Sequence, residues 1–243
     1  MISSIFVIIF IITLVAFIVS IPLNGYMTTF LITHGAYDRV HRYDHAIESV
    51  WDYFDIVGAL CFFFLGFGWG TILPVDQDAI RGKGKGLRTV LAYCAQPLVS
   101  IFLAVLSIIP SMFLTGKACI YTALNMFFVN SLHTATADSA RYIFQQSASQ
   151  FAHCSPYAIT GTLFFIGIVY VQTTILCISM VRNAFQALLY PFGYQLMTAD
   201  YAWVFMIAIP LLFCILFYQF FFSLALAVII LAIEIISSLI KGS

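Results

Sequence analysis

The chain is organised around residues 54–97, FDIVGALCFFFLGFGWGTILPVDQDAIRGKGKGLRTVLAYCAQP. This stretch contains an apolar run, a Gly-aromatic turn (GFGWG), a proline-ended exit (LPVD), a short basic loop and the start of a second apolar run. An apolar run of about 20 residues has the length of a membrane-spanning helix. The stretch therefore predicts two spans, at about residues 56–75 and 89–114, joined by a basic loop at residues 76–88.

The composition of the whole chain agrees with a membrane location. Of 243 residues, 63% are hydrophobic and 8% are charged, whereas soluble domains carry about a quarter charged residues. This excludes a water-soluble globular protein. Ten basic and ten acidic residues cancel, so no excess positive charge indicates a nucleic-acid partner. We expect one all-α, polytopic integral membrane domain over residues 1–243.

Apolar runs on both sides of the central stretch raise the expected number of spans to about six. Residues 1–33 carry no charge and lack the basic start of a signal peptide, which predicts a retained helix of about 20 residues. Pro22 and Gly25 are expected to kink or end this helix. Further spans are expected at residues 157–181 and, divided near Gln219, twice within residues 201–240. Residues 118–137 fit a short or re-entrant helix as well as a full crossing.

Three polar segments separate these runs. The basic loop 76–88 is the best cytoplasmic marker, since positive loops stay inside. Residues 34–55 are the most polar segment and are expected to form an interfacial helix or ordered loop, with four aromatic residues at the headgroups: Tyr37, Tyr43, Trp51 and Tyr53. Residues 138–156 are expected to be an external loop. Cys119 and Cys154 flank one inter-span region and could pair in an oxidising compartment.

A series of landmark residues follows the order Asp55 and Gly58, then Gly68, Trp69, Pro74 and Val75, then Ala95, Pro97 and Ser100. In this order the chain resembles the site-2 protease family of intramembrane zinc metalloproteases, which shows a D-P-x-G turn, a G-W-x-x-P-V-x-V run and a helix opening with A-G-P-x-x-N. Gln96 and Ser100 replace the Gly and Asn of the last motif. Further along, Asn183, Pro191 and Gly193 echo the surroundings of the family's L-D-G motif. The resemblance implies a site-2-protease-like fold over nearly the whole chain.

The catalytic residues of that family are missing. The family binds zinc with the two histidines of H-E-x-x-H, uses the glutamate as general base, and takes a third ligand from the Asp of L-D-G. Counting back from Asp55 places Asn24, Gly25 and Thr28 where the first His, the Glu and the second His belong. Residues 183–196 contain no Asp, and the chain contains no H-E-x-x-H. The resemblance therefore implies an inactive homologue with no catalytic residues and no expected cofactor, zinc included.

One other group has metal-ligand spacing. His41 and His45 are four residues apart, and Asp38 and Glu48 lie on the same face if this segment is helical. The same pattern is typical of a solvated, charge-paired interfacial helix. These four residues lie outside the zinc positions of the family.

The leading functional hypothesis is a catalytically inactive, site-2-protease-like protein that binds other membrane proteins and lipid, as a scaffold or as a subunit of a homo- or hetero-oligomeric complex. One alternative is an active intramembrane zinc metallopeptidase with displaced ligands such as His41 and His45. Another is a transporter or ion-pathway subunit that uses Glu234, an ionisable residue in the last expected span. The expected location is a bacterial-type cytoplasmic membrane or an organelle inner membrane.

Overall fold

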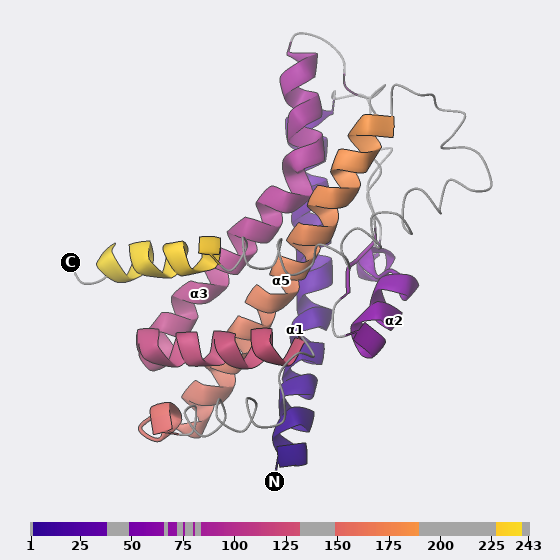
Figure 1. Ribbon diagram of the computed structural model, residues 1–243. Coiled ribbons are helices and arrows are strands. Elements are labelled where there is room, and N and C mark those ends of the chain that lie inside the picture. The colour runs from indigo at the N-terminus through magenta and orange to yellow at the C-terminus, as the bar shows by residue number, and fades with distance from the viewer. Residues whose placement is uncertain are drawn as a thin grey trace. The chain divides into compact units, whose positions relative to one another are not determined.

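The computed structural model describes residues 2–37, 49–65, 68–71, 75, 80, 84–131, 149–189 and 227–239. The named elements within these ranges are α1 (Ile2–Leu31), the π-helix η1 (Ile32–Ala36), the 3-10 helix η3 (Val50–Tyr53), α2 (Ile56–Leu65), α3 (Lys85–Ser131) and α5 (Pro156–Leu189) (Figure 1). A shorter apolar helix covers Ala227–Leu239. The β pairing found in these ranges is an isolated bridge between Phe54 and Gly70. The predicted all-α class is confirmed for this part of the chain.

Three of the described helices are long and apolar enough to cross a membrane. They cover Val7–Ala36, Lys85–Phe127 and Pro156–Ala184, which are the regions of three predicted spans. The helix Ala227–Leu239 is too short to meet the same length requirement on its own. The total of about six spans stays a prediction, because residues 190–226 lie outside the described ranges.

The first helix does not stop at its proline. Pro22 lies inside α1, which continues to Leu31, and the π-helix extends it by a further turn to Ala36. The predicted end of the helix near Pro22 and Gly25 is therefore wrong, and a kink there stays a prediction. In an apolar setting the helical backbone is the only local partner for its own polar groups. Threonine side chains add to this network, as when the Thr29 hydroxyl donates to the Gly25 carbonyl oxygen at 2.9 Å.

The expected helix over residues 56–75 is also wrong in its second half. The helix α2 ends at Leu65, and residues 68–71 are not helical. Gly66, Gly68 and Gly70 follow in alternation, and each glycine weakens a helix by roughly 1 kcal/mol relative to alanine. The ten residues of α2 rise about 15 Å, half the thickness of a hydrocarbon core.

A break at Gly116 divides α3. This glycine has φ 78° and ψ 173°, a backbone conformation that is essentially restricted to glycine. We expect the span 89–114 to end near Pro110 and Gly116, whereas α3 continues through Pro110, breaks at Gly116 and then runs on to Ser131. The chain turns sharply within α3 in Figure 1.

The chain forms two compact units. Unit 1 comprises residues 1–20, 102–173 and 224–243, and unit 2 comprises residues 21–101 and 174–223. The helices α1, α3 and α5 contribute residues to both. Within its most apolar window α5 has 72% of its residues buried, against 44% for α1 and 39% for α3. The helices α1 and α3 therefore present more of their apolar side chains outward.

Candidate functional site

The landmark residues Asp55 and Trp69 are joined in unit 2. The Trp69 indole Nε1 donates to the Asp55 carboxylate at 2.8 Å, and the backbone N–H of Val57 donates to its other oxygen at 2.9 Å. A carboxylate in this position stabilises the first turn of α2. Gly58 completes the arrangement, because a Cβ there would lie 2.1 Å from the Trp69 carbonyl oxygen. Asp55 and Gly58 thus hold the buried Trp69 against the start of α2.

Tyr53 fills the space beside Gly25, the residue at the expected glutamate position. A Cβ on Gly25 would lie 2.1–2.7 Å from three carbon atoms of the Tyr53 ring. The ring is buried, and its hydroxyl is 3.5 Å from the Thr29 hydroxyl. Tyr53 is fixed by its backbone as well, since its carbonyl oxygen accepts from the Thr71 N–H at 2.7 Å. A side chain at position 25 therefore has no room unless Tyr53 moves.

The positions expected for the first histidine and for the A-x-P-x-x-N asparagine contact each other directly. The Asn24 amide Nδ2 donates to the Ser100 hydroxyl at 2.9 Å, which joins α1 to α3. Thr28, at the second histidine position, donates to the Asn24 Oδ1 at 3.4 Å. Asn24, Thr28 and Ser100 are all almost fully buried. We call these three residues the buried polar cluster.

Asn183 donates a hydrogen bond to a backbone carbonyl group that has no donor within its own helix. Pro97 has no N–H, so the carbonyl oxygen of Tyr93, four residues earlier in α3, lacks its usual helical donor. The Asn183 Nδ2 donates to this oxygen. Asn183 also accepts from the Arg182 Nη2 at 2.9 Å. Pro97 of α3 and Asn183 of α5 thus meet at one carbonyl group. Membrane helices tolerate proline in this way, because neighbouring side chains bond the backbone groups that the proline leaves free.

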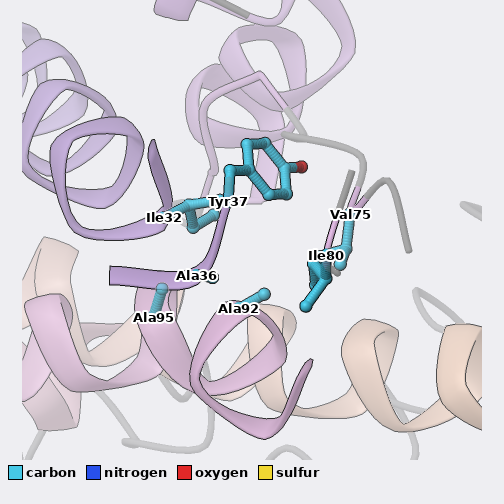
Figure 2. Close-up of a cluster of buried hydrophobic side chains, with 7 residues drawn as sticks. All are labelled: Ile32, Ala36, Tyr37, Val75, Ile80, Ala92 and Ala95. Carbon is cyan, nitrogen blue, oxygen red and sulfur yellow. The ribbon is translucent and has the colours of Figure 1, made fainter. Parts of the chain in front are cut away.

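A set of small and apolar side chains packs next to this polar region. Figure 2 shows Ala92 and Ala95 of α3 close to Ala36, with the Tyr37 ring near Val75 and Ile80. Ala36 and Ala95 are fully buried, and such small residues allow close approach of helix backbones. Tyr37 and Tyr53 are both buried, whereas Trp51 is exposed. That these aromatic residues lie at the headgroups stays a prediction.

The residues at the expected zinc position do not fit zinc. The metal takes thiolate, imidazole or carboxylate ligands, whereas the buried polar cluster offers an amide and two hydroxyl groups. Its amide nitrogen is already a hydrogen-bond donor to Ser100. The Tyr53 ring occupies the space that a general base at position 25 would need. We derive no metal chemistry at this place.

The remaining predicted site residues fall into two groups. Seven of them lie outside the described residues: Asp38, His41, His45, Glu48, Pro74, Pro191 and Gly193. In the part of the chain that the structure describes, no group of three or more His, Cys, Asp or Glu side chains could hold a metal ion. Glu234 is described, and its carboxylate binds the Lys117 ammonium at 2.6 Å and accepts from the Tyr121 hydroxyl at 2.8 Å.

Two residues that the sequence did not place in this site belong to it. Tyr53 lies in a polar segment and is separated from Gly25 by 28 positions, and the absence of a side chain at Gly25 is the one signal that relates them. Arg182 ends a predicted span, yet it is buried, and its Nε has no hydrogen-bond partner among the described residues.

No protein-family model matches the sequence, and no curated protein and no solved structure is significantly similar to it.

Proposed function

We propose that this chain is a catalytically inactive membrane protein with the architecture of the site-2 protease family, and that it works by binding other membrane proteins. The observation that carries the first half is the pair of contacts at the expected zinc position, Asn24 with Ser100 and Gly25 with Tyr53. A metallopeptidase needs an open coordination position for water and substrate there. In this chain the space is filled by side chains that hold helices together.

The second half of the proposal rests on the outer face of α1 in unit 2. Leu23, Tyr26 and Phe30 are exposed, and their spacing puts them on one side of the helix. Asn24 and Thr28, on the other side, are buried and hydrogen-bonded within the unit. The helix is thus fixed on one face and presents two aromatic rings on the other. Large aromatic side chains contribute much of the binding energy at protein interfaces.

Glu234 favours a structural role over an ion pathway. Its charge is paired with Lys117, and the two residues link the helix Ala227–Leu239 to the segment of α3 after Gly116. An ionisable residue that serves an ion pathway would be expected to face a water-filled cavity. Here the carboxylate is instead paired with an ammonium group and a phenol hydroxyl of the neighbouring helical segment.

The proposal can be tested by photo-crosslinking in intact membranes. A photoreactive phenylalanine analogue is placed at Tyr26, at Phe30 and, as a matched control on the same helix, at exposed Ile11. We expect discrete protein adducts from positions 26 and 30, and lipid adducts alone from position 11. Tyr26→Ala should reduce the adduct formed at position 30. Lipid adducts alone from all three positions, or cleavage of a co-expressed membrane segment by the purified chain, would contradict the proposal.

A further inference from the structure

Two cysteines far apart in the sequence face each other in unit 1. The Sγ atoms of Cys119 and Cys154 are 3.8 Å apart. Cys119 lies in the segment of α3 after Gly116, and Cys154 lies in the turn that precedes α5. Both are thiols in this structure. We propose that this pair forms a disulfide bond in the mature protein.

The immediate surroundings favour a disulfide over a metal site. A zinc site needs four ligands, or three and a water molecule. Among the described residues no third His, Cys, Asp or Glu joins these two cysteines in a group that could hold a metal ion. The nearest additional polar contact is the Gln150 carbonyl oxygen, 3.5 Å from the Cys119 Sγ. Two cysteines are enough for a disulfide bond but too few for a zinc site.

The position of the pair along the membrane also favours oxidation. The helix α3 begins at Lys85, next to the basic loop expected in the cytoplasm. At about 1.5 Å per residue, the segment from Lys85 to Gly116 is longer than the hydrocarbon core is thick. A single crossing over this length would carry Cys119 to the side opposite the basic loop. In a bacterial-type membrane that side is the oxidising one, where disulfides persist.

The chemistry requires an oxidant that carries a disulfide, such as a thiol–disulfide exchange protein or oxidised glutathione. Cys154 is the more exposed of the two, so its thiolate attacks the oxidant first and one thiolate of the oxidant leaves. The Cys119 thiolate then attacks the Cys154 Sγ and releases the second thiolate. Two S–H bonds of the protein and the S–S bond of the oxidant break, one S–S bond forms in the protein, two protons pass to solvent or to the leaving thiolates, and two electrons reduce the oxidant. The product ties the segment after Gly116 to the start of α5.

Differential thiol labelling of the full chain tests this proposal. Membranes are dissolved in SDS with N-ethylmaleimide, the protein is then reduced and treated with iodoacetamide, and peptides are mapped by mass spectrometry. We expect Cys119 and Cys154 to lose the first label and carry the second, while Cys61, Cys94 and Cys177 carry the first. Cys119→Ser should return the first label to Cys154, and Cys154→Ser should return it to Cys119. Cys177→Ser, the matched control, should leave both positions unlabelled in the first step.

First label on both Cys119 and Cys154 in the unaltered chain, or a disulfide that joins either of them to a different cysteine, would overturn the proposal. The result does not depend on whether the chain binds partners through α1, because the two tests concern different units and different chemistry.

Discussion

Gly25 has no side chain, and this allows the Tyr53 ring to lie against the α1 backbone. A glycine inside a helix normally costs stability, since alanine is favoured there by roughly 1 kcal/mol. At Gly25 the tertiary contact outweighs that preference. The same contact fills the space that a side chain at position 25 would need.

This contact predicts that Gly25→Ala destabilises the protein, against the helix preference of alanine. We expect a loss of about 1–3 kcal/mol, the usual cost of overpacking a core. SDS titration followed by circular dichroism measures it. In a Tyr53→Ala background the same substitution should cost little, because the clash is gone. Gly86→Ala, where a Cβ meets nothing within 4 Å, is the control and should be neutral or stabilising.

The buried polar cluster shows how far residue-level inference from the sequence reaches. The order of the landmarks was enough to single out Asn24, Thr28 and Ser100, and the structure brings these three together. The Gly25–Tyr53 contact was not predicted, because Tyr53 stands among charged residues that favour an interfacial position. Burial of that ring depends on a neighbour that is distant in sequence, which local composition does not reveal.

At the scale of elements, α3 and α5 are connected through a backbone group that Pro97 leaves free. Asn183→Ala removes the donor to the Tyr93 carbonyl oxygen and should cost about 1 kcal/mol, the usual net value of a hydrogen bond. Pro97→Ala supplies an N–H to the same oxygen within α3. We therefore expect Asn183→Ala to cost less in a Pro97→Ala background than alone, measured by the same titration. Equal costs in both backgrounds would show that the two residues do not share this carbonyl group.

The break at Gly116 gives a second prediction for α3. With φ 78° and ψ 173°, any residue with a Cβ is strained there, and nothing lies within 4 Å of an added Cβ. Gly116→Ala should therefore destabilise the protein by about 1–3 kcal/mol through backbone strain alone. If alanine instead stabilised the protein, as it does in the middle of a regular helix, α3 would be continuous at this position. Chemical unfolding of both proteins decides between the two.

At the scale of the whole molecule, apolar run lengths predicted the three long helices, because these helices depend on local composition and on the length needed to cross a bilayer. They failed at Pro22, where α1 continues, and beyond Leu65, where α2 stops. In both places the outcome depends on packing: next to Pro22 the buried Asn24 donates to Ser100 of α3, and Gly58 and Gly70 fit against the backbones of Trp69 and Tyr53.

The expected zinc position is a structural contact between helices and the Tyr53 ring. Zinc content of the full chain, purified in detergent and measured by inductively coupled plasma mass spectrometry beside the His41→Ala/His45→Ala double variant, tests this most directly. We predict no stoichiometric zinc in either protein, because the donor set at Asn24 and Thr28 does not suit the metal. About one zinc ion per chain, lost in the double variant, would contradict the account and place a metal centre at displaced histidines.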